Sequence, residues 1–314
     1  MLPIPLKEDS TNVSSSIIRI LLYFDIFNHP LKREEIFAML SLPDACAEAF
    51  NGELKLLVAE NIVTDLNGYY TIYSSDDCVR KRIDGELRAV KMFKKSKRFS
   101  SLIAAFPFVR TVCISGSLSK NVMDKEADVD YFIITAKNRV WVTRMLLILF
   151  KKIFLLNSKK YFCVNYFIAE DALDIREKNI YTATEIATLM PVFNYEGYAE
   201  FMEKNNWYRS FYPNYPLRSD ERKVNGMLQG VKRVSEKLLS GKVGEKVDDL
   251  FFRITLRHWK KKFKNFDEQS FDLRLRSLKT ESKHHPRGFQ EKVLARFDEQ
   301  VRRFEDEHRM EICA

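Results

Sequence analysis

The segment from Val112 to Thr135 constrains the fold of this chain more than any other stretch. Two runs of β-favouring residues enclose a polar connection, which begins with Gly116-Ser117 and ends with Asp128-Val129-Asp130. Because successive side chains of a strand point to opposite faces, we expect Asp128 and Asp130 to project from the same face. The pattern predicts two strands joined by a polar connection, with two carboxylates at the start of the second strand.

The residue types in this segment suit a phosphate ligand bound together with a metal ion. Two neighbouring carboxylates repel each other unless a cation lies between them, and Mg²⁺ is usually held by one or two carboxylates plus substrate phosphates. Gly116 allows a ligand to approach the backbone closely, and Ser117 offers a hydroxyl and an amide donor. The segment therefore predicts a phosphoryl-transfer site with Mg²⁺, or Mn²⁺, on Asp128 and Asp130.

Two further residues of the polar connection are candidates for binding the phosphates. Ser119 lies close to the Gly-Ser turn, and Lys120 supplies a cation that suits a leaving pyrophosphate. The alternative for Lys120 is simple exposure in a polar loop. Asp124 and Glu126 fall outside both strands, so we expect them to face water.

The ordered set Gly116, Ser117, Asp128 and Asp130 between two hydrophobic strands resembles the signature of the nucleotidyltransferase superfamily with the DNA polymerase β-like fold. Ten residues separate Ser117 from Asp128, which agrees with that signature. The resemblance implies an α+β fold with a mixed sheet. It also implies a metal-dependent enzyme that moves a nucleoside monophosphate from a nucleoside triphosphate to an acceptor hydroxyl. The acceptor, whether a small molecule, a protein or an RNA, stays open.

A third strand, predicted at 161–168, lacks the acidic residue that the resemblance implies. In the superfamily such a strand usually carries a carboxylate that completes the metal site and acts as general base. By alternation, one face of this strand carries Tyr161, Cys163, Asn165 and Phe167. Asn165 is the polar candidate among them. Its amide oxygen can bind Mg²⁺ or orient a hydroxyl, but it cannot accept a proton at physiological pH.

Several alternatives remain open for this position. One alternative is that Asn165 is a neutral ligand of the site, and another is that it is a structural residue hydrogen-bonded inside the strand. A nearby acid, Glu170 or Asp171, is a candidate for the base that Asn165 cannot provide. The alternative function is a catalytically weak nucleotide-sensing or regulatory protein, which acts through the N-terminal part of the chain on a protein or DNA partner.

The N-terminal part predicts three helices followed by a β-hairpin. Apolar residues recur at helical spacing over 14–28, with serines in front as caps, and further helices fit 32–40 and 44–61, the latter capped by Asp44. Asn67-Gly68 joins two strand-like runs and is the strongest short hairpin signal. This order resembles a winged helix-turn-helix.

The charges of the third helix argue against DNA recognition by this module. A helix that reads DNA should be basic or neutral, because attraction to the DNA phosphates supplies most of the non-specific affinity. Against the single basic residue Lys55, this helix carries Asp44, Glu48, Glu53 and Glu60. Docking to a protein, or to another part of the chain, is therefore favoured over DNA binding.

A strongly basic segment precedes the first strand of the motif. Nine basic residues lie between Arg80 and Arg98, where the acidic residues are Asp84 and Glu86. We expect a helix here. Its charge has two interpretations, a solvated outer face or an electrostatic funnel for a triphosphate or an RNA-like substrate.

The remainder of the chain predicts helices and a packed aromatic layer. We expect helices over 139–156 and 182–190, the second closed by Pro191, and a mostly helical region from 219 onward. The aromatic-rich stretch 194–216 is typical of core packing rather than base stacking. The predicted organisation is a winged-helix-like domain at 1–76, a nucleotidyltransferase-like domain at 77–195 and a C-terminal, mostly helical region at 196–314.

Composition restricts the class of protein without choosing a function. The 314 residues are 46% hydrophobic and carry a net charge of +9, which favours polyanionic partners such as a nucleoside triphosphate. The five cysteines are scattered without metal-ligand spacing, which is typical of a reducing compartment. Basic residues interrupt the most apolar run, 140–156, and the first residues lack the apolar core of a signal peptide. We therefore expect a cytoplasmic protein without a membrane partner.

Overall fold

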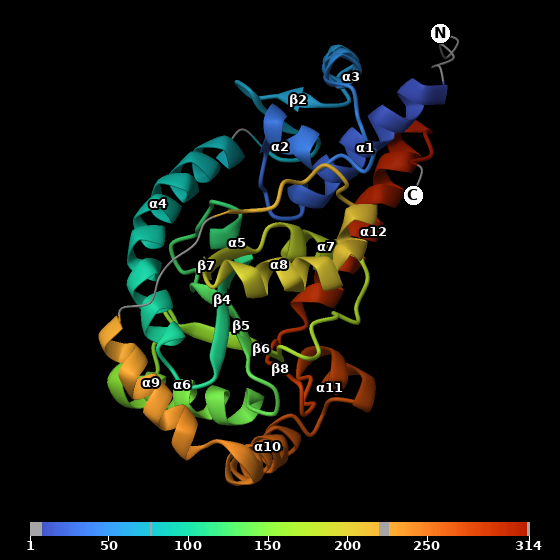
Figure 1. Ribbon diagram of the computed structural model, residues 1–314. Helices are drawn as coiled ribbons and strands as arrows, with labels where there is room; N and C mark the ends of the chain where they lie inside the picture. Colours follow the sequence, from blue (N-terminus) through green and yellow to red (C-terminus); the bar gives the residue numbers. More distant parts are fainter. Residues whose placement is uncertain (1–7, 76, 220–225, 313–314) are drawn as a thin grey trace.

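The computed structural model describes residues 8–75, 77–219 and 226–312, which form helices and two β-sheets (Figure 1). The expected α+β class is confirmed. In chain order, the elements are α1 (Glu8–Asp25), β1 (Leu31–Lys32), α2 (Arg33–Ala38), α3 (Ala47–Ala59), β2 (Thr64–Asp65), β3 (Tyr69–Thr71), α4 (Asp77–Ala104), β4 (Val109–Ser115), α5 (Gly116–Ser119), β5 (Asp130–Thr135), α6 (Val140–Phe154), β6 (Cys163–Ala169), α7 (Ile180–Ala187), β7 (Met190–Phe193), α8 (Tyr195–Lys204), the 3₁₀ helix η1 (Asn206–Ser210), α9 (Gly226–Leu238), α10 (Gly241–Lys262), α11 (Glu268–Arg274), β8 (Glu281–Lys283) and α12 (Phe289–His308).

The larger sheet has five strands in the order β7-β4-β5-β6-β8. β5 and β6 are parallel and are connected by α6, whereas the other neighbours pair antiparallel, so the sheet is mixed. Its three central strands, β4, β5 and β6, are the three strands that the sequence predicted. The two strands of the motif therefore lie side by side at the centre of the sheet.

Both edge strands come from segments in which the sequence predicted no strand. The expected helix over 182–190 ends at Ala187, and Met190 and Pro191 begin β7 instead of closing a helix. A proline is tolerated in an edge strand because one side of that strand needs no backbone donor. β8 comes from the C-terminal region and pairs with β6, so this mostly helical region also completes the sheet.

Helices cover both faces of the sheet (Figure 1). On one face, α4, α6 and α10 pack against a layer that includes Val112, Tyr131 and Phe167. On the other face, Phe132 and Ile134 belong to a core shared with α7, α8, α12 and the N-terminal helices. In the part of the chain that the structure describes, every helix is too short or too polar to cross a lipid bilayer.

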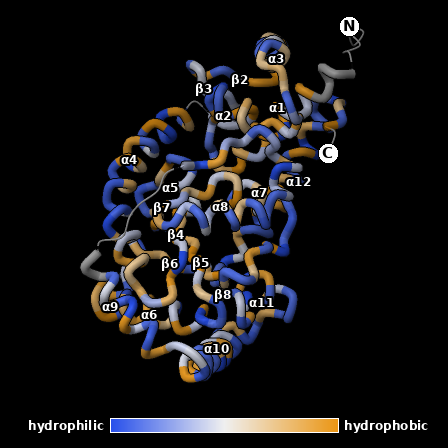
Figure 2. The backbone as a smooth tube through the Cα atoms, viewed as in Figure 1, coloured by the Kyte–Doolittle hydropathy of each residue, from blue (hydrophilic) through white to orange (hydrophobic). Residues whose placement is uncertain are grey.

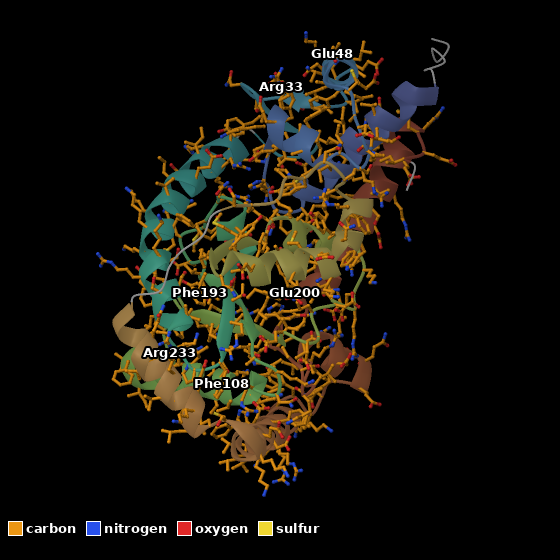
Figure 3. All side chains as sticks on the ribbon, viewed as in Figure 1. Arg33, Glu48, Phe108, Phe193, Glu200 and Arg233 are labelled. Carbon is orange, nitrogen blue, oxygen red and sulfur yellow. The ribbon has the colours of Figure 1, made fainter. Side chains whose placement is uncertain are left out.

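The N-terminal module contains the three helices and the hairpin that were expected. β1, from the segment between α1 and α2, pairs with the hairpin and gives a small sheet in the order β1-β3-β2. Asn67 and Gly68 have φ angles of 58° and 85°, which is typical of the tight turn that their sequence predicted. On the outer surface of this module lie Arg33 and Glu48, the latter on α3 (Figure 3).

The two predicted helix caps in this module are wrong. Asp44 lies in a left-handed turn with φ of 53°, and α3 begins three residues later, after Cys46. Ser14 to Ser16 lie inside α1, which begins at Glu8. These serines are buried and connect α1 to neighbouring segments, since Ser14 donates to Glu53 and the Ser16 and Ser41 hydroxyls lie 2.9 Å apart. Tertiary packing, and not local capping, determines their position.

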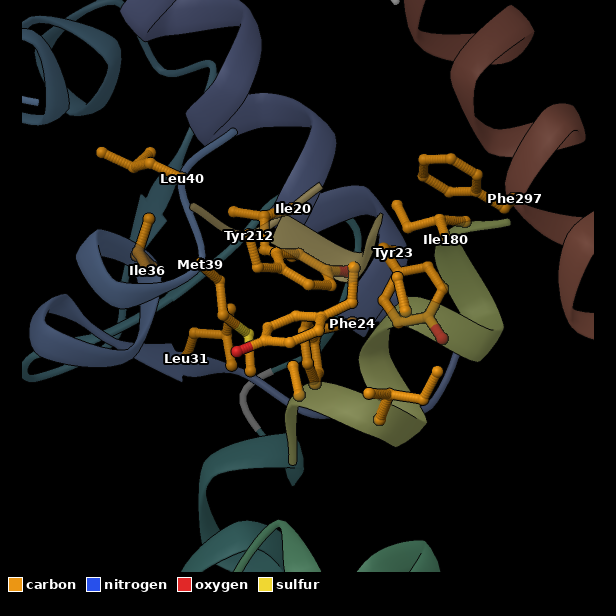
Figure 4. Packing of buried hydrophobic residues seen from close by; sticks show 14 of the residues in the cluster. Ile20, Tyr23, Phe24, Leu31, Ile36, Met39, Leu40, Ile180, Tyr212 and Phe297 are labelled. Atoms are coloured by element: carbon orange, nitrogen blue, oxygen red, sulfur yellow. The ribbon is translucent and has the colours of Figure 1, made fainter. Parts of the chain in front are cut away.

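The N-terminal module and the larger sheet share one hydrophobic core. Tyr23 and Phe24 of α1 pack among Ile180, Tyr212 and Phe297, which come from three other parts of the chain (Figure 4). The rings of Tyr23 and Phe297 meet edge to face at 5.6 Å. The prediction that the aromatic stretch 194–216 packs into the core is confirmed by its buried members, which are Tyr198, Phe201, Tyr208 and Tyr212.

A buried arginine fixes α4 to the N-terminal module. The Arg82 side chain is 1% exposed and forms ion pairs with Glu35 at 2.5 Å and with Glu86 at 2.9 Å. We expect Arg82→Met to lower the free energy of unfolding by about 2 kcal/mol, because it leaves two carboxylates without their buried partner. Urea unfolding of the full chain measures this loss. The matched control is Arg80→Met on the exposed side of α4, where the change should stay within about 0.5 kcal/mol.

Candidate functional site

The end of β4 and the start of β5 bring the predicted phosphate turn against the predicted metal ligands. Ser115, the last residue of β4, pairs directly with Asp130, the first residue of β5. Gly116 follows with φ of +68°, and a Cβ atom at this position would lie 2.8 Å from Oδ2 of Asp130. Only glycine fits here without strain, because a side chain would require both a rare backbone conformation and displacement of the carboxylate.

The residues after Gly116 form the single turn α5. Ser117 is partly exposed at this turn. Ser119 is buried, and its hydroxyl donates to the Gly116 carbonyl at 2.8 Å, so the structure places it inside the turn as a support. Lys120 is mostly buried and its ammonium donates to the same carbonyl at 3.2 Å. Lys120 is therefore not the freely exposed loop residue of the alternative interpretation.

Asp130 has the orientation that alternation predicted. Val129 and Tyr131 are buried in the layer under α4 and α6, which leaves Asp130 on the opposite face. The pKa of Asp130 is raised to about 6, chiefly by burial and also by the nearby carboxylates of Glu185 and Asp128. Hydrogen bonds from Cys163 and Asn165 oppose this shift. The site thus concentrates negative charge around Asp130, which a cation would stabilise.

Asn165 contacts the site through an irregularity in β6. Tyr131 pairs with Val164 and Phe132 pairs with Tyr166, so Asn165 is the extra residue of a β-bulge. Its side-chain amide donates to Oδ1 of Asp130 at 3.0 Å. The prediction that Asn165 and Phe167 share one face is wrong, because the bulge resets the alternation and turns Phe167 toward the opposite core.

Glu170 and Asp171 lie at the other end of the sheet. β5 and β6 run parallel from the site, and Glu170 follows the last residue of β6. Its carboxylate accepts from the Lys137 amide at 3.2 Å, and Asp171 forms an ion pair with the Lys137 ammonium at 3.2 Å. The hypothesis that one of them is the base of this site is wrong, since the length of the strand separates them from Asp130.

The structure instead brings Glu185 of α7 to the site. One of its carboxylate oxygens accepts from the Lys120 ammonium at 2.7 Å, and the other accepts from the Gly116 amide at 3.3 Å. Sequence reasoning missed this residue because α7 follows the motif by some fifty residues and belongs to no recognised pattern. One signal was available, since Glu185 is the single charged residue of an otherwise apolar and hydroxyl-rich helix.

α4 supports the polar connection from its outer side. The Met123 amide donates to the Gly85 carbonyl at 3.1 Å, and Arg88 donates to the Met123 carbonyl at 2.8 Å. A Cβ atom on Gly85 would lie 2.5 Å from a Val122 methyl carbon, so the helix and the connection touch closely. Asp124 and Glu126 beyond this contact are exposed, as predicted.

The carboxylates of the site fit a magnesium ion whose remaining ligands come from a substrate. Among the described residues, no three His, Cys, Asp or Glu side chains come together as a complete metal site. Mg²⁺ does not need such a set, because it typically takes one or two carboxylates and completes its shell with phosphates and water. The carboxylates of Asp128 and Glu185 lie near Asp130, whose pKa is raised to about 6 chiefly by burial, and together they provide the negative charge for such an ion.

The raised pKa of Asp130 predicts a pH-dependent stability. The folded protein keeps this proton up to about pH 6, whereas the ordinary pKa is 3.8, so the stabilisation from protonation is lost as the pH rises through about 6. We expect Asp130→Asn to match wild type near pH 4. At pH 8 and without divalent cations it should be more stable by about 3 kcal/mol, because the pKa is raised by roughly two units and each unit corresponds to about 1.4 kcal/mol.

Thermal unfolding in EDTA at the two pH values measures this difference. A gain of about 3 kcal/mol corresponds to roughly 5–8 °C in Tm. Asp124→Asn, which changes an exposed carboxylate of the same connection, is the matched control and should leave Tm unchanged at both pH values. Equal Tm values for wild type and Asp130→Asn at pH 8 would show that Asp130 is not destabilised by its surroundings.

Comparison of the chain with models of known protein families, with curated protein sequences and with solved structures found no match.

Proposed function

We propose that the protein is a metal-dependent nucleotidyltransferase that moves a nucleoside monophosphate from a nucleoside triphosphate to an acceptor hydroxyl. The observation that carries this proposal is the direct apposition of Gly116 and Asp130, in which a phosphate-binding turn meets a charged carboxylate cluster. Binding of a triphosphate with Mg²⁺ satisfies both halves of this arrangement at once.

Each residue of the cluster has a role in this proposal. The missing side chain of Gly116 lets a phosphate approach the turn, the amide and the hydroxyl of Ser117 hold its oxygens, and Lys120 brings a positive charge to the same turn. Asp128 and Asp130 hold Mg²⁺, and Asn165 orients Asp130 through its hydrogen bond. A bound Mg²⁺ supplies positive charge to the triphosphate and to the pyrophosphate that leaves.

Glu185 takes the role of the missing third carboxylate. It lies at the amide of Gly116 and at the ammonium of Lys120, so it borders the phosphate turn. When Lys120 contacts a phosphate, the carboxylate of Glu185 is released from its ion pair and can accept the proton of the attacking hydroxyl. This assignment restores a base that Asn165 cannot provide.

The N-terminal module is proposed as a docking element. Its order of helices and strands, with β1 between α1 and α2 and a hairpin after α3, is that of a winged helix. Its third helix presents Glu48 and Glu60 to solvent, which opposes binding to DNA phosphates. The module shares one hydrophobic core with α7 and α12. A partner that binds the module therefore binds the same folded unit that carries the site.

Incubation of the purified protein with each labelled nucleoside triphosphate and Mg²⁺ or Mn²⁺ tests the proposed function. Release of pyrophosphate and transfer of label to an acceptor establish the chemistry and identify the base. Nucleotide binding without turnover, across small-molecule, protein and RNA acceptors, would overturn the enzyme proposal and identify a nucleotide-sensing protein. The absence of both binding and turnover would overturn both functions.

A further inference from the structure

The second half of α4 carries cations that the fold itself does not neutralise. Lys91, Lys95 and Arg98 follow one another at a spacing of four and three residues, so they lie on one exposed side of the helix. Within the described residues none of them forms an ion pair, whereas Arg80, Lys81 and Arg82 in the first half all do. Along its length α4 alternates hydrophobic and hydrophilic residues, as expected for a helix with one face outside (Figure 2).

This side of α4 continues onto the segment that precedes β6. The Lys95 ammonium lies 3.5 Å from the Tyr161 hydroxyl and 5.4 Å from the centre of its ring. The exposed residues Lys159 and Lys160 come directly before this tyrosine. The Lys160 carbonyl accepts from the Val129 amide at 3.0 Å, so the backbone of Lys160 lies next to the residue that follows Asp128.

The end of α10 joins the same region from the other side. The backbone of His284 donates to the Asn165 carbonyl at 2.9 Å, and its ring packs 4.9 Å from that of Trp259 on α10. The ring of Phe263, the residue after Lys262, lies 6.2 Å from the same imidazole. The basic segments near 80–98 and 257–266, far apart in the sequence, therefore both lie near the start of β6, the first through Tyr161 and the second through His284.

We propose that these cations form a basic belt that binds the phosphodiester backbone of a nucleic-acid strand. The basic belt consists of Lys91, Lys95, Arg98, Lys159, Lys160 and Lys262, all of which are exposed. It extends over two helices and a connecting segment, which is more than a single triphosphate at Gly116 requires. Multiple phosphate contacts are the usual source of sequence-independent affinity for nucleic acids.

The composition of the belt favours a nucleic acid over a protein. Lysine is depleted in protein–protein interfaces, which instead bury aromatic and aliphatic residues. The large exposed aliphatic residues of α4, Ile83, Leu87 and Val90, all lie on the N-terminal side of the belt. Binding of the strand goes beyond the proposed function, and only its use as the acceptor rests on that function.

Fluorescence anisotropy with a labelled 20-nucleotide single-stranded RNA, and with the same sequence as duplex DNA, tests the belt in 50–200 mM KCl. The test variant is Lys91→Glu/Lys159→Glu. The control is Lys237→Glu/Lys242→Glu, which reverses two exposed lysines near the opposite end of the sheet and changes the net charge equally. We expect at least tenfold weaker binding for the test variant at 100 mM KCl, a shallower salt dependence, and a change of at most about threefold for the control.

Three outcomes would overturn the belt. They are no binding by wild type at 100 µM protein (about the weak end of non-specific affinity), equal losses in the test and control variants, and binding to vesicles of anionic lipid without binding to either nucleic acid. Preference for RNA or for DNA identifies the kind of strand. Because the assay contains no nucleotide, its failure leaves the proposed chemistry intact, and absence of turnover leaves the belt intact.

Discussion

Asp128→Asn is expected to reduce nucleotide transfer by at least about a thousandfold while the chain stays folded. The carboxylate of Asp128 adjoins that of Asp130, and the two are the proposed ligands of Mg²⁺. An amide of the same shape removes the charge that holds the ion, and charge stabilisation of this kind typically contributes about 10²–10³ or more to turnover. Pyrophosphate release under saturating Mg²⁺ and nucleoside triphosphate measures the loss.

The control for this substitution is Asp124→Asn. Asp124 belongs to the same polar connection but is exposed and lies four residues before Asp128. Its variant should keep transfer within about twofold, since isolated surface substitutions change little. If Asp128→Asn keeps wild-type turnover and metal-dependent binding of nucleotide, the assignment of the metal site to this carboxylate pair fails.

Glu185→Gln is expected to lower kcat by about a hundredfold, which is the lower range for loss of a general base. The substitution keeps the hydrogen bond from the Gly116 amide but cannot take up a proton. It also removes the ion pair with Lys120, which then has its charge free for phosphate. The KM for the nucleoside triphosphate should therefore change little or fall, so the defect appears in kcat. Steady-state kinetics with saturating acceptor separates the two constants.

Two further variants test whether Glu185 takes up the proton of the acceptor hydroxyl or only positions Lys120 at the turn. Glu185→Asp keeps a carboxylate on a shorter side chain and should recover part of the lost kcat. Glu170→Gln changes a glutamate at the opposite end of the sheet and should leave kcat unchanged. A loss of folding stability in Glu185→Gln together with wild-type kcat would show that Glu185 only positions Lys120.

The sequence by itself determined the motif and the elements that carry it. Alternation placed Asp130 on the face of β5 opposite Tyr131, and Asn67-Gly68 specified the hairpin, because strand periodicity and turn chemistry depend on a few adjacent residues. Gly116 could also be identified, because the positive φ and the lack of room for a side chain concern this single position. These features require no knowledge of distant parts of the chain.

Only the tertiary structure decided what surrounds the motif. The partner of Asp130 depends on a bulge at Asn165, which arises from the pairing of two strands. Glu185 reaches Gly116 from α7, and Tyr161 and His284 connect the two basic segments to β6, although none of these residues is near the motif in sequence. Strand register and helix packing are set by burial across the whole core, so local patterns cannot reveal which side chains they bring together.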